Sequence, residues 1–423
     1  MINSNIPKIR FKEFINNWNN YKLGELGNFK SGIGFPDSQQ GGTEGIPFFK
    51  VSDMNYIGNE TEMRNANNYV TQDQIIKNSW KVINETPAII FAKVGAALML
   101  NRKRLVTRPF LIDNNTMSYS FDESWDKDFG LTLFQTINLP KYAQIGALPS
   151  YNASDIAMIK VNVPDIQEQS AIGTLFRTLD DLLASYKDNL ANYQSLKATM
   201  LSKMFPKAGH TIPEIRLDGF EGEWECIKMA DIFQIIDGDR GKSYPGESDF
   251  SSFGHTLFLD TGNVKKTGLD FSTTKFISEE KDKELRNGKL TLGDFILTSR
   301  GTLGNVAYYD ENIQKRFSSV RINSAMLILR PLLGDKISPE YILAVLRGNL
   351  ISDFMKVNQV GSAQPHITKK EFSKIKVLVP SNIQEQRAIG SYFSNLDNLI
   401  NSYQDKISQL ETLKKKLLQD MFI

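Results

Sequence analysis

The sequence predicts an α+β protein with two globular α+β domains separated by two long helices. We expect these helices to pack as an intramolecular antiparallel coiled coil, with a pseudo-twofold repeat relating the halves. The prediction rests on three observations: two stretches of the chain recur, the longer one carries a heptad pattern without proline, and the segments between the repeats differ. A pair of repeated helices that carries two different globular domains accounts for all three observations.

The chain repeats itself in two places. Residues 6–18 and 212–224 align at an offset of 206, and six of the thirteen positions are identical. Residues 166–205 and 383–422 align without a gap at an offset of 217, and nineteen of the forty positions are identical. A gene duplication without functional meaning is one explanation. Because the helical part stayed alike while the intervening segments diverged, we favour two domains with different tasks.

The longer repeat has apolar residues seven positions apart, which indicates an amphipathic helix with one packing seam. At a rise of about 1.5 Å per residue, each helix would be roughly 57 Å long. Ordinary core helices of one large globule are the alternative, but the length and regularity of the pattern argue against it. The residues predicted to pack the helices are Ile172, Leu179, Tyr186, Tyr193 and Met200, and in the second copy Ile389, Leu396, Tyr403, Leu410 and Leu417.

The heptad pattern by itself leaves parallel and antiparallel pairing open, and we predict the antiparallel arrangement. The segments between the repeats contain short apolar runs typical of strands, such as 88–91, 295–298 and 324–329, separated by loops rich in Gly, Asn and Ser. The predicted division of the chain is a first globular domain at 1–150, the first helical region at 151–206, a second globular domain at 207–365 and the second helical region at 366–423.

Composition excludes several classes of protein. Lys plus Arg is 50 and Asp plus Glu is 48, so a net charge of +2 rules out a uniformly basic nucleic-acid coat. Cys226 is the single cysteine, so no disulfide can form within the chain, and we expect a buried thiol. The histidines His210, His255 and His366 form no metal-binding pattern. No apolar run is long enough to span a membrane and no signal peptide is visible, so we expect the cytoplasm.

No catalytic centre is predicted. Residues 241–243, Gly-Lys-Ser, resemble the end of a phosphate-binding loop, but Ile236 stands where the first glycine of that loop is required. Asp180 and Asp181 lie beside the heptad stripe and are predicted to form a solvated face rather than a metal site.

Basic residues gather in segments predicted to be loops, in both domains. Arg108 and Arg321 lie beside two of these groups, and several members have Asn, Ser or Thr as neighbours. Such residue types contact phosphates and base edges in DNA complexes, although a solvated surface charge is the alternative for each one. The DNA-contact candidates are Lys93, Arg102, Lys103, Arg104, Lys265, Lys266, Arg300, Lys315 and Arg316.

Taken together, these features resemble the specificity subunit of type I restriction–modification enzymes, over essentially the whole chain. One motif is the opening Pro7, Arg10, Phe11, Phe14 and Trp18, which recurs at Pro213, Arg216, Phe220 and Trp224. The others are Pro164 with Gln169, Pro380 with Gln386, and the element Gly361, Gln364 and Pro365. The first copy of that last element departs from the family pattern, with Leu148 in place of Gln, so no role of that Gln is carried over.

The resemblance implies two target recognition domains that each read one half of a bipartite duplex DNA target. It also implies that the helices set the spacer and dock two methyltransferase subunits, and that motor–nuclease subunits join the complex. The chain itself would be noncatalytic and bind no cofactor; S-adenosylmethionine, ATP and Mg would be held by the partners. We expect no membrane partner.

Two other functions remain as alternatives. A single-chain modification or cleavage enzyme would need a cofactor pocket or a metal-binding core, and the sequence shows neither. A noncatalytic coiled-coil scaffold that does not read DNA would explain the helices but leaves two large globular domains without a task.

Overall fold

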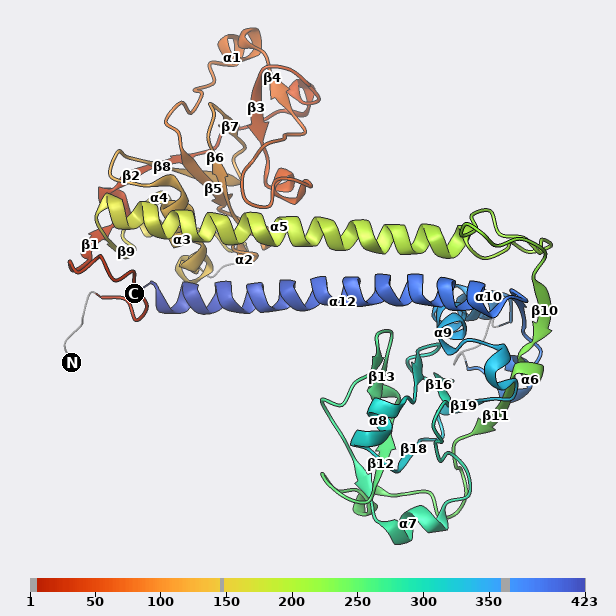
Figure 1. The fold of residues 1–423 in the computed structure, drawn as a ribbon. Coiled ribbons are helices and arrows are strands. Elements are labelled where there is room, and N and C mark those ends of the chain that lie inside the picture. Colours follow the sequence, from red (N-terminus) through yellow and green to blue (C-terminus); the bar gives the residue numbers. More distant parts are fainter. Residues whose placement is uncertain (1–5, 145–147, 359–365, 423) are drawn as a thin grey trace. The chain divides into compact units, whose positions relative to one another are not determined.

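The computed structural model describes residues 6–144, 148–358 and 366–422 (Figure 1). The chain forms two compact units: unit 1 comprises Met1–Tyr186 with Lys406–Ile423, and unit 2 comprises Lys187–Asp405. The heptad pattern corresponds to two helices of 38 residues each, α5 (Ile166–Lys203) and α12 (Ile383–Asp420), as predicted. Each of these helices contributes one part to unit 1 and another to unit 2. No helix in the described part of the chain is apolar over a length that would cross a membrane.

Unit 1 combines short strands with short helices ahead of α5. Its strands are β1 (Asn19–Lys22), β2 (Gly27–Ser31), β3 (Ile46–Phe49), β4 (Tyr69–Val70), β5 (Ala88–Ala92), β6 (Lys103–Val106), β7 (Leu111–Ile112), β8 (Thr116–Phe121) and β9 (Lys160–Val163). Its helices are α1 (Gln72–Asn78), α2 (Ala96–Met99), α3 (Lys127–Thr136) and α4 (Ala153–Ala157).

Unit 2 has the same kind of composition. Its strands are β10 (Glu225–Lys228), β11 (Phe233–Asp237), β12 (Thr256–Leu259), β13 (Val264–Lys265), β14 (Gly268–Leu269), β15 (Phe276–Ile277), β16 (Phe295–Thr298), β17 (Val306–Tyr308), β18 (Val320–Ile322), β19 (Met326–Pro331) and β20 (Lys376–Val379). Its helices are α6 (Met229–Ile232), α7 (Glu279–Glu284), α8 (Glu311–Arg316), α9 (Pro339–Arg347), α10 (Leu350–Asn358) and α11 (Lys369–Phe372).

The two units share the topology of their four-stranded and three-stranded sheets, and unit 2 has an additional two-stranded sheet, β13-β14. A four-stranded antiparallel sheet has the order β2-β8-β5-β6 in unit 1 and β11-β19-β16-β17 in unit 2. A three-stranded sheet follows, with the order β4-β3-β7 and β15-β12-β18, and in both copies its middle strand pairs in parallel with the last. The predicted α+β class and the duplicated architecture are therefore confirmed, although the segments that build the sheets have diverged.

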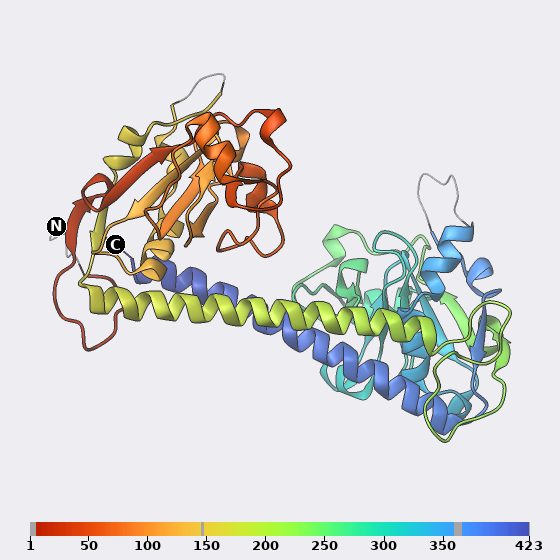
Figure 2. The same ribbon diagram turned by 90° about the horizontal axis from the view of Figure 1, so that it is seen from above.

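Within each unit, α5 and α12 lie side by side and run antiparallel (Figures 1 and 2). In unit 1, Lys414 Nζ lies 2.5 Å from Asp180 Oδ1, and Phe176 contacts Phe422 nearer the end of α12. In unit 2, Lys197 Nζ lies 2.5 Å from Asp397 Oδ1. The two ion pairs are equivalent in the repeat, because each joins the same lysine position to the same aspartate position. Asp180 is thus a helix-pairing residue rather than a solvated one.

The heptad residues are buried most in the first half of each long helix. Ile172, Leu179, Ile389 and Leu396 are between 1% and 8% exposed. The remaining members are half-buried: Tyr186, Tyr193, Met200, Tyr403, Leu410 and Leu417. Tyr193 and Tyr403 face each other with ring centroids 5.4 Å apart in unit 2.

The short repeat forms an arm that an arginine fixes to the start of a long helix. Arg10 donates through Nε and Nη2 to the two carboxylate oxygens of Glu168, both at 2.6 Å. Arg216 does the same to Glu385, with both distances 2.8 Å. The two carboxylates are at most 1% exposed, and such bidentate pairs fix geometry as well as charge. This contact explains why Arg and Glu are identical in the two copies.

The glutamines that follow these glutamates join α5 and α12 to their domains. Gln169 accepts from the Asp126 amide at 2.9 Å and donates to the carbonyls of Ser124 and Pro164. Gln386 makes the equivalent contacts to Ser338, Lys336 and Pro380. The amide oxygen of each side chain accepts one hydrogen bond and the NH2 group donates two, so both are satisfied inside the protein, as a buried amide requires.

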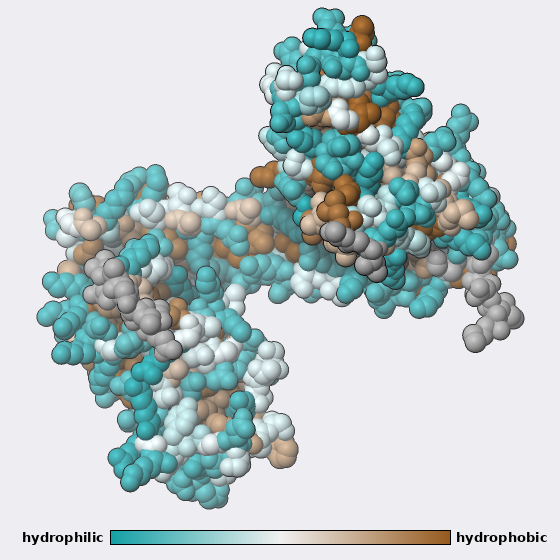
Figure 3. Space-filling view, turned by 180° about the vertical axis from the view of Figure 1, so that it is seen from behind, coloured by the Kyte–Doolittle hydropathy of each residue, from teal (hydrophilic) through white to brown (hydrophobic). Residues whose placement is uncertain are grey.

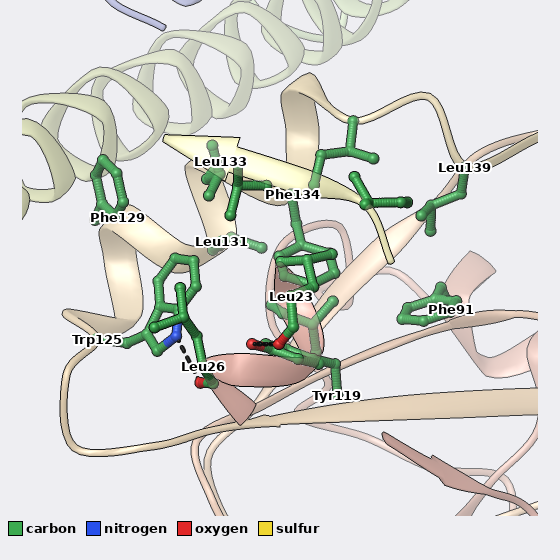
Figure 4. Close-up of a cluster of buried hydrophobic side chains, with 14 of the residues drawn as sticks. Leu23, Leu26, Phe91, Tyr119, Trp125, Phe129, Leu131, Leu133, Phe134 and Leu139 are labelled. Carbon is green, nitrogen blue, oxygen red and sulfur yellow. Dashed lines mark hydrogen bonds between the residues drawn. The ribbon is translucent and has the colours of Figure 1, made fainter. Parts of the chain in front are cut away.

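The core of unit 1 is rich in aromatic side chains, and Figure 4 shows part of it. Trp125 donates from its indole to the Leu26 carbonyl at 2.8 Å, and the Tyr119 hydroxyl donates to the Leu23 carbonyl at 2.9 Å. These bonds satisfy the polar ends of large buried rings.

The end of each long helix packs into the core of the unit there. Phe422, after α12, contacts Trp18 and Phe129 in unit 1, and Phe205, after α5, contacts Trp224 and Tyr341 in unit 2. In both units the arm also bonds to the helix end: Ile9 N donates to Asp420 O, and Ile215 N to Lys203 O, each at 2.9 Å.

Candidate nucleic-acid interface

Loops converge at one end of the four-stranded sheet in unit 2. Gly238, which follows β11, donates its amide to Met326 O at 3.3 Å. Ser299, which follows β16, donates to Ala325 O at 2.9 Å and accepts from the Ile367 amide at 3.0 Å. Loops from distant parts of the sequence thus lie together at one end of the strands, where a rigid sheet positions their side chains. We call this end of the sheet, with its loops, the loop edge.

The same end of the sheet in unit 1 has the same backbone contacts. Gly32 donates to Thr116 O at 3.1 Å, and Lys93 donates to Asn115 O at 2.9 Å. Lys93 also accepts from the Tyr151 amide at 3.3 Å, so Lys93 occupies the place that Ser299 holds in unit 2. The two units therefore present equivalent loop edges with different side chains.

Three of the predicted residues in unit 2 lie at this edge. Arg300 is exposed on the loop after β16, Lys265 ends β13, and Lys266 lies on the turn between β13 and β14. The two loops are joined, because Asn305 Nδ2 donates to Val264 O at 2.8 Å. The structure therefore brings together a basic group that is separate in sequence.

Further basic residues at this edge were not among the predicted ones. Arg240 is exposed, and its guanidinium donates to Ser324 O at 3.1 Å. Arg286 lines a cavity of about 270 Å³ together with Arg240 and Asp239. In the sequence, residues 237–246 are rich in glycine, which indicates a loop but does not specify which distant residues lie next to it.

Lys315 and Arg316 are placed differently. They are the last two residues of α8. The loop that contains Arg300 leads into the start of β17, whereas α8 follows the end of β17, so the two lie at opposite ends of this strand. The Arg316 guanidinium lies 5.0 Å and 4.9 Å from the ring centroids of Phe271 and Phe317. This stacking gives Arg316 a structural role in unit 2.

In unit 1, Arg102 directly precedes β6 and Lys93 directly follows β5, and Phe91 and Lys103 form the last pair between these two strands. Arg102 is half-buried and donates to Asn55 Oδ1. Arg104 is also half-buried, with one guanidinium nitrogen bonded to the Lys103 carbonyl at 2.9 Å.

Lys103 points to the opposite side of β6 from Arg104 and into the protein. It is 5% exposed, and its Nζ donates to the Ile137 carbonyl at 2.5 Å. A buried ammonium group cannot touch a phosphate in this conformation, so the structure argues against a DNA contact for Lys103. Burial lowers the pKa of Lys103 to about 7, because a charged amine is disfavoured away from water.

The lowered pKa of Lys103 predicts a pH-dependent stability of unit 1. The unfolded lysine, with the ordinary pKa of 10.5, binds more protons than the folded one between about pH 7 and 10.5. The free energy of unfolding should therefore rise with pH across this window, by about 2 kcal/mol between pH 7 and 9. Urea unfolding at both pH values measures the effect, and a Lys103→Met variant should lose this increment. An equal increment in the variant would assign the effect to other groups.

Two other expectations from the sequence are wrong. Arg321 is not a surface cation: it is 4% exposed, its Nε donates to Asp282 Oδ1, and Nη2 donates to the carbonyls of Asp282 and Leu285. Cys226 is exposed rather than buried, because β10 is a short strand paired only with β20 within the described residues.

The loop Gly241–Ser243 is not arranged as a phosphate cradle. The Asp239 carboxylate accepts from the amides of Gly241 and Arg286 at 2.6 Å each and of Asn287 at 3.2 Å. An internal carboxylate therefore occupies amide donors that a phosphate would need. Among the described residues, no group of three or more His, Cys, Asp or Glu could hold a metal ion.

One of the motifs lies mostly outside the described residues. The element Gly361, Gln364 and Pro365 falls in the gap at 359–365, and its first copy at Gly146 falls in the gap at 145–147.

The duplicated fold, with one loop edge in each unit, defines a class of α+β proteins that have two recognition-like domains and two long helices. Comparison with known proteins gives the family. The model of the type I restriction modification DNA specificity domain matches twice, at residues 15–218 and 221–412. The chain therefore belongs to the family of type I restriction–modification DNA specificity domains.

Two curated relatives come from Methanocaldococcus jannaschii. The type I restriction enzyme MjaVIII specificity subunit is 22% identical over 275 residues, which cover 64% of this chain and 63% of the relative. The putative MjaX specificity subunit is 22% identical over 299 residues, covering 67% and 64%. The matched region thus spans less than two thirds of either relative.

Two solved structures share the fold. The S subunit of a type I restriction–modification system from M. genitalium has a TM-score of 0.65 at 17% identity and is covered over 99% of both chains. A chain from a structure on complex assembly and conformational transition of the type I R-M system has a TM-score of 0.51 at 16% identity, with 95% of this chain and 96% of the other covered.

Proposed function

We propose that this protein is the DNA-specificity subunit of a type I restriction–modification complex. Each unit reads one half of a bipartite duplex DNA target, and α5 and α12 set the spacer between the halves. The observation that carries the proposal is the pair of equivalent loop edges with different side chains. Equivalent scaffolds give equivalent placement on DNA, while different side chains give different half-sites.

The proposed subunit performs no catalysis. Two methyltransferase subunits dock on it and hold S-adenosylmethionine, and motor–nuclease subunits with ATP and Mg join for restriction. Complex formation fits the near-neutral charge, because partner subunits then share in neutralising the DNA phosphates. A scaffold that does not read DNA has less support, because the family is one of DNA specificity domains.

The proposal is tested by mapping adenine methylation in the native genome with and without this gene. We expect one split motif, methylated on both strands, to disappear when the gene is deleted. The result gives the target and the spacer length together. An unchanged methylation pattern in a strain that expresses an active methyltransferase partner would overturn the proposal.

The loop edge of unit 2 provides a second prediction. Lys265→Ala, Lys266→Ala and Arg300→Ala together should weaken DNA binding by the complex and reduce the salt slope by about one for each phosphate that the altered edge no longer binds. Titration of labelled duplex at several salt concentrations measures both quantities.

A control with the same reduction of charge uses exposed lysines of unit 2 in β10, α11 and β20, Lys228→Ala, Lys370→Ala and Lys376→Ala. It should keep the salt slope of the unmodified protein. Equal effects in the two variants would show that the loop edge has no special role.

A further inference from the structure

The segment that follows β3 in unit 1 has a structural counterpart after β12 in unit 2. Lys50 directly follows β3, and its amide donates to Asp53 Oδ2 at 2.7 Å. Asp260 directly follows β12, and its amide donates to Asn263 Oδ1 at 2.9 Å. The two contacts are the same at an offset of 210 residues, so both segments leave their strand in an equivalent way.

Beyond this contact, both copies turn at a glycine. Gly58 and Gly268 stand at the same offset and have positive φ angles, 92° and 129°. The residues just before them differ, because 55–57 are Asn-Tyr-Ile whereas 265–267 are Lys-Lys-Thr. Equivalent stretches of backbone thus carry an aromatic and an apolar side chain in unit 1 and two lysines in unit 2.

Both segments lie at the loop edge of their unit. In unit 2, Asn305 directly precedes β17, and its Nδ2 donates to the Val264 carbonyl at 2.8 Å. In unit 1, Arg102 directly precedes β6, and its guanidinium donates to Asn55 Oδ1. The segment 55–57 therefore lies in unit 1 where the lysine segment lies in unit 2.

Ile57 is the most exposed large hydrophobic side chain in the described part of the chain, at 89%, and Tyr56 beside it is 46% exposed. Exposure alone does not set a residue apart, because hydrophobic residues lie among hydrophilic ones at several places on the visible surface (Figure 3). Its place at the loop edge and the way its backbone is held distinguish Ile57.

A buried asparagine fixes the backbone on which Ile57 stands. Asn59 is fully buried, and its Nδ2 donates to the carbonyls of Asp53 and Asn65, at 2.8 Å each. Its own amide donates to the Tyr56 carbonyl at 3.0 Å. Ile57 therefore lies close to a fixed residue on a backbone that is held by hydrogen bonds, and such preorganisation lowers the entropy cost of binding.

The chemistry of the side chain restricts which groups of DNA Ile57 can contact. It has no donor for a phosphate or for an acceptor on a base edge, whereas the lysines of the equivalent segment are suited to phosphates. In the major groove, the C5 methyl group of thymine is the apolar group that a base pair presents. An exposed isoleucine at the loop edge therefore fits a thymine.

We propose that Ile57 contacts a thymine C5 methyl group in the half-site that unit 1 reads, and that Lys265 and Lys266 bind phosphates at the equivalent place in unit 2. This inference rests on the proposed function and assigns a specificity-determining residue to unit 1. The same part of the fold then contributes to the choice of base in unit 1 and to salt-dependent affinity in unit 2.

The test replaces thymine by deoxyuridine, which lacks only the C5 methyl group, at one position of the target at a time. The full-length chain in complex with the methyltransferase of the same system is titrated with each duplex. The half-site of unit 1 is the one that changes when residues 19–149 are exchanged. One uridine in that half-site should weaken binding about fourfold, as expected for the loss of one buried methyl group.

The variant Ile57→Ala should weaken binding of the thymine duplex and should no longer distinguish uridine from thymine at that position. It should keep the salt slope of the unmodified protein, because no phosphate contact is lost.

The matched control is Ile76→Ala. Ile76 is 67% exposed on α1, which follows β4, and Val70 at the end of β4 pairs with Ile46 at the start of β3. The helix therefore begins beside the opposite end of β3 from the segment 55–57. This control should keep the full response to uridine, and its melting temperature gives the baseline for Ile57→Ala.

Several results would overturn the assignment. One is a half-site of unit 1 in which no uridine weakens binding, and another is an Ile57→Ala complex that keeps the loss at the same position. A third is no response to uridine together with brightening of 2-aminopurine in that half-site by the unmodified protein alone, which would show insertion between bases. If the unmodified complex bound no split target, the proposed function itself would fail before any uridine duplex is compared.

Discussion

Replacing Arg216 by alanine is expected to lower the free energy of unfolding of unit 2 by about 3–5 kcal/mol. The change leaves Glu385, which is 1% exposed, without its bidentate partner, and a buried unpaired carboxylate is costly. Arg216 also donates to the carbonyls of Glu221 and Gly222, so the change removes hydrogen bonds within the arm as well as the ion pair that attaches the arm to α12.

Hydrogen exchange measures this destabilisation unit by unit. Arg216→Ala should raise exchange in the first turns of α12 and in β10, with α3 in unit 1 unchanged. Arg10→Ala is the matched variant and should produce the mirror result, because Arg10 binds Glu168 in the same way.

A double variant separates the ion pair from packing. Arg216→Met with Glu385→Leu removes both charges and should recover much of the stability, since no charge is left buried. A destabilisation as large as that of the single variant would instead assign the effect to the hydrogen bonds of the arm.

Exchanging residues 19–149 for the same segment of a relative is expected to change one half of the methylated target completely and leave the other half and the spacer as they were. The loop edge of unit 1 lies inside this segment, whereas Arg10, Glu168 and the long helices lie outside it. The exchanged domain should therefore be held in the same place by the same arm and long helices.

The structure adds one condition to the design. The replacement must keep residues 124–129, because the Asp126 amide and the Ser124 carbonyl bind Gln169. It must also keep close packing there, because a Cβ on Gly173 would lie 2.6 Å from the Phe129 nitrogen. Methylation mapping of the exchange strain gives the result. The reciprocal exchange of unit 2, residues 225–365, is the control and should change only the other half. A change in both halves from either exchange would contradict independent reading.

The helices and the duplication could be predicted because their signals are local and periodic. The heptad pattern marked the segments that became α5 and α12, and the identical Gln169 and Gln386 marked where each helix joins its domain. The pattern did not specify pairing direction, which is visible only in contacts such as Lys197 with Asp397. The strand predicted from residue 324 starts at Met326, because Asn323 Oδ1 accepts from the Ala325 amide and closes a turn.

The candidate interface was less predictable, because a charged residue in the sequence does not reveal whether its side chain points to the solvent or into the protein. Lys103 and Arg104 are adjacent and look alike, yet alternation along β6 buries the first amine and leaves the second side chain half-buried. Arg300 and Lys265 lie on two segments that are distant in sequence and are joined by the hydrogen bond from Asn305 to the Val264 carbonyl. From the sequence, Arg321 was expected at the surface. In the structure it is buried and paired with Asp282, which lies 39 residues away in the sequence.

The hydrogen bond from Ile9 to Asp420 has a consequence for the path of the polypeptide. Its counterpart, from Ile215 to Lys203, spans a short continuous stretch of chain, whereas residues 420 and 9 are joined only by folding. The junction between arm and helix therefore occurs twice, and only one of the two joins residues that are close in sequence. A polypeptide that joined residue 422 to residue 6 and began within 206–211 would retain the same pairing of arms, helices and sheets.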